Sequence, residues 1–95
     1  MGRKITGVQL RAARALLRWS ALDLAAASKV GVATIRRAEV IDGEIPVTAA
    51  NEAALRRTLE AAGVELIEEN GGGVGVRLKK PLRKQPKLLA RRVKR

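Results

Sequence analysis

The residues best suited to chemistry in this chain are two neighbouring arginines, Arg36 and Arg37, in the stretch 33–39, which reads ATIRRAE. Thr34 adds a hydroxyl group close by. A guanidinium is a planar, permanently charged donor that can hold a phosphate, or the edge of a guanine, through two parallel hydrogen bonds. These residues therefore indicate binding to a polyanion, not a chemical reaction.

Residue types that usually carry catalysis are scarce. The chain has no His and no Cys, and its 9 Asp and Glu residues are scattered. Disulfides and the usual zinc ligands are thereby excluded. The glycine run 71–73 lacks the Lys-Ser/Thr pair that completes a P-loop. We expect no catalytic residue, no metal and no cofactor, and therefore no enzyme.

The net charge of +11, from 20 Lys and Arg against 9 Asp and Glu, also predicts a polyanionic partner. Much of this excess lies in the segment 81–95, which is broken by prolines and contains no acid. We expect this segment to be disordered and to serve as a non-specific DNA arm. The rest of the chain is only mildly basic, so net charge alone does not locate a binding site.

A membrane protein is not expected. No apolar run approaches the roughly 18 residues of a membrane span. Arg11, Arg14 and Arg18 interrupt the stretch that a signal peptide would need to keep apolar. We expect a cytoplasmic protein.

The arginines at 36 and 37 need a helix to position them, and the stretch 24–39 predicts two. Leu24, Ala25 and Ser28 fall at helical spacing, and Ile35 and Ala38 resume that spacing on one face of a second helix. The break between them is short (Lys29, Val30 and Gly31), with an apolar Val30 and a glycine that can cap the second helix. Helices joined by so short a turn must cross steeply, which is the geometry of a helix-turn-helix.

This stretch resembles the Xre or Cro phage-repressor type of helix-turn-helix. The residues that carry the resemblance are Leu24 and Ala25, Val30 in the turn, and the run 33–39, and the likeness extends over about residues 9–43. It implies a mainly α fold, with a compact four-helix domain of the lambda-repressor-like kind. It also implies a transcriptional regulator, acting as a dimeric repressor on a palindromic operator in double-stranded DNA.

The resemblance assigns roles to particular residues. The first residues of the second helix and Arg37 would reach base edges, and an ion pair between Arg14 and Glu39 would hold that helix in place. The predicted DNA-binding set is Ser20, Gly31, Val32, Ala33, Thr34, Arg36 and Arg37. Val32 and Ala33 can touch thymine methyl groups, Thr34 is a candidate phosphate contact, and Ser20 caps a helix whose N-terminus can face a phosphate.

Three features of the stretch depart from the family pattern. The family usually has glycine where Lys29 stands, and Ser or Thr where Gly31 stands. It often has basic residues after the second helix, where this chain has Asp42 and Glu44. A lysine in the left-handed conformation costs about 1 kcal/mol, so we expect a looser turn.

Two other functions fit the same residues. The chain could be an antitoxin that masks a toxin partner through its C-terminal part while repressing its own operon. It could also be a non-specific nucleic-acid binder that uses the basic tail alone.

The remaining elements are expected as follows. Helices should cover 7–18 with Thr6 and Gln9 as a capping box, 21–28 with Ser20 as its cap, 32–40, and 48–63 with a buried stripe. That stripe comprises Ala50, Ala54, Leu55, Thr58, Leu59 and Ala62. Residues 1–5 should be frayed and Trp19 should pack in the core.

Strands are expected at 64–68 and 74–79, with Glu65 and Glu68 opposite Arg77 and Lys79. A lone hairpin is marginal in water, so we expect it to pack on a helix or to pair with a second copy. The expected units are a DNA-binding domain at 1–63, a hairpin at 64–80 that serves dimerisation, and the basic tail at 81–95.

Overall fold

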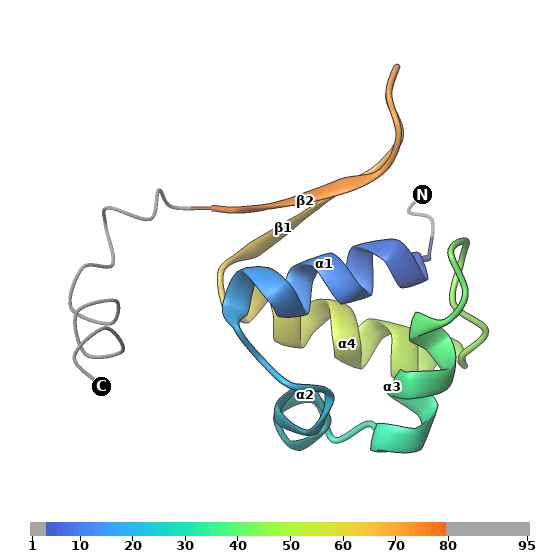
Figure 1. Cartoon of the computed structure of the whole chain (residues 1–95), viewed down its shortest axis with the longest axis vertical. Helices are drawn as coiled ribbons and strands as arrows, with labels where there is room; N and C mark the ends of the chain where they lie inside the picture. Colours follow the sequence, from blue (N-terminus) through green and yellow to red (C-terminus); the bar gives the residue numbers. More distant parts are fainter. Residues whose placement is uncertain (1–3, 80–95) are drawn as a thin grey trace, which may run out of the picture.

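The computed structural model describes residues 4–79, and within this range the chain forms four helices followed by one antiparallel hairpin (Figure 1). The helices are α1 (Gly7–Leu17), α2 (Ala21–Ser28), α3 (Val32–Glu39) and α4 (Ala49–Ala61), and the strands are β1 (Val64–Ile67) and β2 (Gly75–Leu78). The prediction of a mainly helical fold with a C-terminal hairpin is confirmed. The expected arm at 81–95 lies outside the described residues.

Polar side chains cap the starts of α1, α2 and α4. Thr6 and Gln9 form the predicted capping box of α1, Ser20 forms another with Asp23 at α2, and the Thr48 side chain caps α4. α1 ends one residue earlier than predicted because Arg18 turns into the left-handed conformation, with φ of 60°. The early part of the chain is thus well specified by local sequence.

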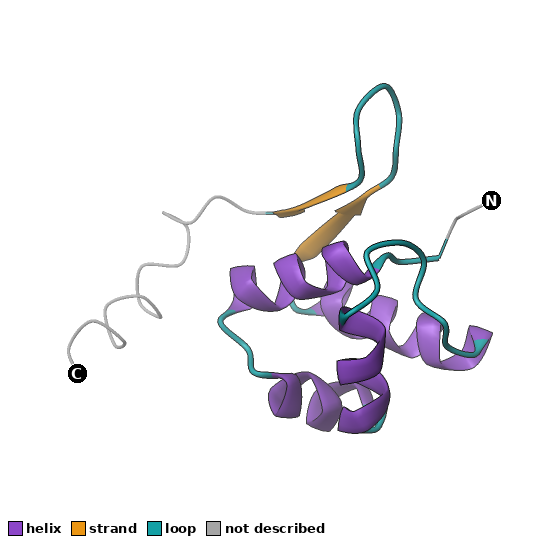
Figure 2. Cartoon of the chain, turned by 45° about the vertical axis from the view of Figure 1, so that its right-hand side comes forward, coloured by secondary structure: helices purple, strands orange, loops and turns teal. Residues whose placement is uncertain are grey.

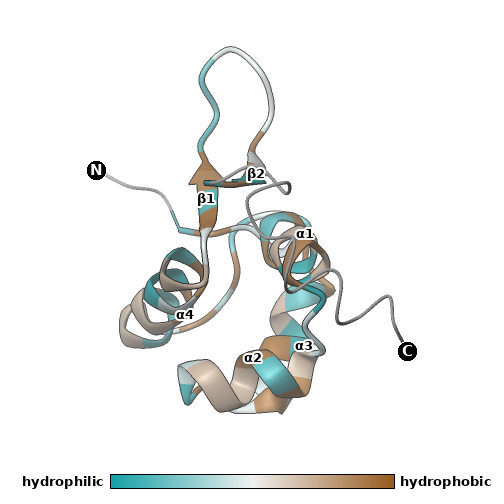
Figure 3. Ribbon diagram, turned by 90° about the vertical axis from the view of Figure 1, so that its left-hand side faces the viewer, coloured by the Kyte–Doolittle hydropathy of each residue, from teal (hydrophilic) through white to brown (hydrophobic). Residues whose placement is uncertain are grey.

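The core lies where α1, α2, α3 and α4 meet beneath the hairpin. Its fully buried large side chains come from every part of the fold: Ile5, Leu10, Leu24, Ile35, Ile45, Leu55, Leu59 and Val64. Trp19 is half-buried and packs against this cluster, as predicted. The hairpin and the α2–α3 pair lie at opposite ends of the molecule, with α1 and α4 between them (Figure 3).

Two predictions of burial were wrong. Ile5 is not frayed but is 1% exposed, because its N–H donates to Glu52 Oε2 at 3.1 Å and its carbonyl accepts from Ile45 N at 3.0 Å. Ala50 does not belong to the buried stripe of α4, since it lies exposed in the first turn of that helix. Ile5 is held in part by the loop between α3 and α4, which local periodicity does not describe.

The hairpin pairs Val64 with Leu78, Glu65 with Arg77, Leu66 with Val76 and Ile67 with Gly75. The expected pair of Glu65 and Arg77 is present, with Arg77 Nε 2.8 Å from Glu65 Oε1. The pair expected between Glu68 and Lys79 was wrong because Glu68 lies beyond the end of β1. Lys79 instead donates from its backbone N–H to Gly63 O at 2.7 Å.

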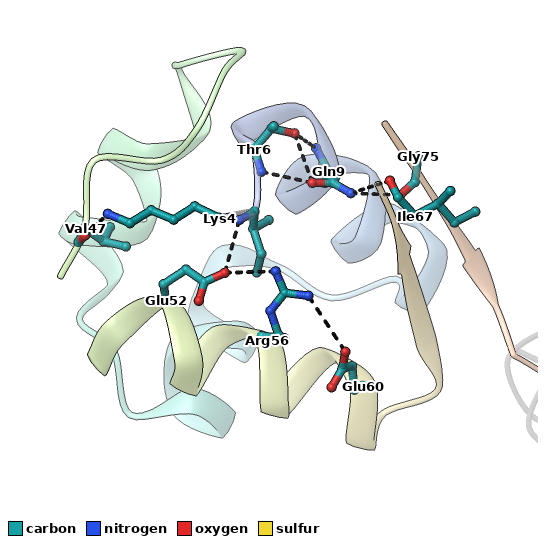
Figure 4. A network of polar contacts seen from close by, with 10 residues as sticks. Lys4, Thr6, Gln9, Val47, Glu52, Arg56, Glu60, Ile67 and Gly75 are labelled. Carbon is teal, nitrogen blue, oxygen red and sulfur yellow. Dashed lines mark hydrogen bonds and ion pairs between the residues drawn. The ribbon is translucent and has the colours of Figure 1, made fainter. Parts of the chain in front are cut away.

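The hairpin packs on the helices, β1 against α4 and both strands against α1. Gln9, which is 4% exposed, links the two parts (Figure 4). Its Nε2 donates to Ile67 O and Gly75 O, both at 3.0 Å, while its Oε1 accepts from Thr6 N at 3.0 Å. One amide therefore completes the cap of α1 and holds the loop end of the hairpin, where Ile67 faces Gly75. The division of the chain into units at residue 63 stays a prediction.

Candidate nucleic-acid interface

α3 has one buried side and one exposed side. Ile35 and Ala38 are 0% exposed, and Glu39 is 8% exposed. Ala33, Arg36 and Arg37 point away from this face and are exposed. The period of 3.6 residues that places Ile35 and Ala38 inward therefore leaves both guanidinium groups on the outer surface.

The turn before α3 is short, and α2 and α3 are steeply inclined to each other (Figures 1 and 2). Lys29 ends α2 in the left-handed conformation, with φ of 68°, and its N–H donates to Ala25 O at 2.8 Å. Val30 is 3% exposed and fills the corner between the helices. The strain expected at Lys29 is thus present, and the buried valine and the hydrogen bond hold the turn despite it.

Gly31 stands at the N-cap of α3 without a side-chain hydrogen bond, and its carbonyl accepts from Ile35 N at 3.1 Å. The first N–H groups of α3 consequently have no capping side chain within the described residues. Ser28 supports the turn instead, because its buried Oγ accepts from Val30 N at 3.1 Å. Sequence reasoning did not assign Ser28 this role, although a serine at a helix end is a common partner for a nearby N–H.

The ion pair between Arg14 and Glu39 is present. Arg14 Nε lies 2.6 Å from Glu39 Oε2, and Nη2 lies 2.8 Å from Oε1, so the carboxylate is held bidentately. The third nitrogen, Nη1, donates to Trp19 O at 2.8 Å. The hydrogen bonding that Arg14 donates to the Glu39 carboxylate raises the pKa of Arg14 above its ordinary value, and burial opposes this only in part. Arg14 therefore ties the end of α3 to α1 and to the loop that leads into α2.

Arg11 is a further structural residue that sequence reasoning missed. It donates to the backbone carbonyl of Glu39 and pairs with Asp42, whose Oδ1 lies 3.1 Å from its Nη2. Asp42 is one of the acids that stand where the family often has basic residues, and its negative charge would repel an approaching phosphate. Its pairing with Arg11 offsets part of that effect, and no local pattern links two residues so far apart in the chain.

The predicted DNA-binding residues do not all lie together. Gly31, Val32, Ala33, Thr34, Arg36 and Arg37 share α3 and its cap, whereas Ser20 stands at the far end of α2 from the turn. Val32 is half-buried and packs against the core. Thr34 Oγ1 accepts from Arg37 Nη2 at 3.4 Å, which orients that guanidinium along the helix.

Arg36 has no hydrogen bond or ion pair to any other residue in the range 4–79. Val40, which directly follows α3, is 78% exposed. It falls four residues after Arg36, so Ala33, Arg36, Arg37 and Val40 form one outer stripe at helical spacing. The exposure of Val40 could have been predicted from the sequence, because helical spacing places Val40 off the face defined by Ile35 and Ala38.

Among residues 4–79, no helix is long and apolar enough to cross a membrane. No group of acidic side chains in the same range is arranged to hold a metal ion. The sequence matches no protein-family model, and no curated protein matches it significantly.

Proposed function

We propose that this chain is a sequence-specific DNA-binding transcriptional regulator of the Xre or Cro type. In this proposal α2 and α3 form the helix-turn-helix and α3 is the recognition helix. The resemblance of residues 9–43 to that family motivates the assignment, and the short turn, the buried Val30 and the Arg14–Glu39 pair are consistent with it.

One observation carries the proposal. α3 is fixed by its buried side, through Ile35, Ala38 and the Glu39 carboxylate, and it turns Arg36 and Arg37 to solvent. Neither guanidinium has an acidic partner within residues 4–79. A rigid helix that bears unpaired arginines on its outer face suits the major groove, where an arginine can bind guanine O6 and N7 together.

The roles follow from side-chain chemistry. Arg37 and Arg36 donate to guanine edges or phosphates, and Ala33 offers a methyl group to a thymine methyl. The hydroxyl of Thr34 and the uncapped N–H groups after Gly31 are suited to phosphate oxygens. Ser20 would contact the backbone through the start of α2. Because α3 carries few hydrogen-bond donors, the sequence specificity at each half-site is modest.

We propose further that the regulator acts as a homodimer and represses from a palindromic operator. One copy of α3 reads only a few base pairs, so a second copy is needed for useful affinity. The two half-sites would lie about one helical turn, roughly 34–36 Å, apart.

Selection of bound DNA from a random library tests the proposal. We expect a palindromic consensus with guanine in each half-site. Arg37→Ala should then weaken binding to that sequence by about 1–3 kcal/mol, or roughly 5- to 150-fold, while Arg57→Ala, an exposed arginine on α4, should change it little. The absence of any consensus, or equal losses for the two variants, would instead support a non-specific binder.

A further inference from the structure

An open apolar groove of about 440 Å³ lies between the α1–α2 loop, α2 and the last turns of α4. Its walls are the indole of Trp19 and the small side chains of Ala27, Ala61 and Ala62, with Thr58 and Arg57 beside them. Ala27 and Ala61 are exposed, and Trp19 is only half-buried. No described residue fills the groove.

The described part of the chain ends beside this groove. Lys79 donates from its backbone N–H to Gly63 O at 2.7 Å, and from Nζ to Glu60 O at 3.5 Å. Glu60 and Gly63 flank Ala61 and Ala62, which line the groove. Whatever follows Lys79 therefore starts next to the end of α4.

The sequence that follows contains suitable side chains. Residues 80–95 include one pair of adjacent leucines, Leu88 and Leu89, with basic residues nearby on both sides. A chain spans at most about 3.3–3.6 Å per residue, so the nine residues from Lys79 to Leu88 can reach up to about 30 Å. That length comfortably covers the last turns of α4, which rise about 1.5 Å per residue.

The charges also fit this occupant. The C-terminal end of a helix carries a partial negative charge on its free carbonyl groups, and cations are favoured there. Lys79 Nζ already lies against Glu60 O at that end of α4. Arg57 at the rim would repel further cations within the groove itself. The groove therefore favours apolar side chains, and basic residues beside them suit the helix end or solvent.

We propose that this groove is an intramolecular docking site for Leu88 and Leu89 of the chain's own C-terminal segment. The two leucines cover the exposed face of Trp19 and the alanines of α2 and α4. Apolar leucine surface that leaves water stabilises the docked state, which offsets the entropy of fixing a short stretch of chain. The inference does not depend on DNA binding.

Trp19 is the chain's one aromatic residue, so all of the tryptophan fluorescence comes from a side chain that lines the groove. The full-length chain is compared with the full-length double variant Leu88→Ser with Leu89→Ser. We expect the variant's emission maximum to move to longer wavelength. Its quenching constant with acrylamide, a neutral quencher, should rise about twofold, because a docked segment shields one side of the indole.

The matched control is Gln85→Ser with Ala90→Ser, which changes the same segment without touching the leucines and should leave the fluorescence unchanged. Identical fluorescence for the wild type and the leucine variant would overturn the proposal. A second measurement uses the chain without substitutions, so its result does not depend on how a variant folds. In a mixture of isotope-labelled and unlabelled chains, contacts between the Trp19 indole and leucine methyl groups should appear within one chain. Contacts solely between different chains, or none at all, would also overturn it.

Discussion

At the scale of single residues, Arg14 and Glu39 fix the end of α3 on α1. Their side chains are 23% and 10% exposed, so the pair is largely shielded from water, and both carboxylate oxygens are used. Because folding raises the pKa of Arg14, the charged guanidinium contributes its full stabilisation at every pH below the ordinary pKa of arginine. The contribution is lost only as the pH rises through the raised pKa, at strongly alkaline values. The pair should thus stay intact throughout the neutral range.

Glu39→Ala removes the carboxylate and leaves the Arg14 guanidinium half-buried with one remaining carbonyl partner. We expect the free energy of unfolding to fall by about 1.5–3 kcal/mol, since hydrogen bonds to a charged group are lost. Urea unfolding, followed by circular dichroism, measures this. The exposed pair of Glu65 and Arg77 supplies the control, and Glu65→Ala should have a much smaller effect. Equal effects would show that Glu39 has no special structural role.

Gly7 is the second residue on which the placement of α3 depends. A Cβ added there would lie 1.6 Å from Ile41 O and 2.7 Å from Ala38 O, so α1 must pass directly against the backbone that ends α3. We expect Gly7→Ala to lower the free energy of unfolding by about 1–3 kcal/mol or more, because backbone on both sides must move. Gly72→Ala is the control, since nothing lies within 4 Å of its added Cβ. A neutral Gly7→Ala variant would contradict this close packing.

The sequence predicted single-residue features where the signal was local or was carried by the family resemblance. The capping box of Thr6 with Gln9 and the cap at Ser20 were predicted, and both are present. The structure adds that Asp23 completes a capping box with Ser20. The Arg14–Glu39 pair followed from the resemblance. Arg11 and Ser28 were missed because their partners depend on how distant backbone segments meet, which no spacing rule encodes.

At the scale of elements, the four helices were predicted from periodicity and caps, with errors of a residue or two at their ends. α3 ends at Glu39 where residue 40 was expected, and α4 ends at Ala61 before Gly63, whose φ is 106°. The N-terminal segment was the largest error. Ile5 gains its burial and hydrogen bonds from Ile45 and Glu52, in a loop and a helix that are far away in sequence.

The hairpin is attached to the helices by the amide of Gln9. Gln9→Glu keeps the acceptor for Thr6 N but replaces the Nε2 donor with an oxygen that faces Ile67 O and Gly75 O. We expect backbone amides of β1 and β2 to exchange with solvent faster while those of α1 change little. The reason is that only the hydrogen bonds from Gln9 to the hairpin are lost, while the bond from Thr6 N to residue 9 remains. Hydrogen exchange measured by NMR resolves the two groups.

Thr6→Ala is the matching control for Gln9→Glu. It removes the cap of α1 and leaves both donors to the hairpin in place. We expect it to speed exchange in the first turn of α1 and to spare the strands. Uniform effects of both variants over the whole chain would argue against a separate attachment of the hairpin through Gln9.

At the scale of the whole molecule, the hairpin and α3 lie at opposite ends (Figures 1 and 3). In a dimer formed through the hairpin, the two copies of α3 can face the same side of a DNA duplex under one condition. The two-fold axis must run roughly along the line from the hairpin to α3. Both recognition helices then point the same way, as two half-sites on one face of a duplex require.

Light scattering coupled to size exclusion tests this assembly. We expect a dimer at tens of micromolar, and we expect Ile67→Lys, on the hairpin face away from the helices, to shift it toward monomer by placing a charge there. Glu69→Lys, in the hairpin loop, serves as the control for added charge. A wild-type chain that elutes as a monomer would contradict the proposal of a dimer formed through the hairpin.

The central claim is that the arginines of α3 read guanine in the major groove. It is tested most directly by replacing each guanine of the selected operator, in turn, with 7-deazaguanine, which lacks the N7 acceptor. At one guanine per half-site we expect the substitution to weaken binding of the wild type by about 1–3 kcal/mol, while binding of Arg37→Ala, already without that contact, stays unchanged. If the wild type and Arg37→Ala lose the same affinity at every guanine, α3 does not read DNA through Arg37, and the account is contradicted.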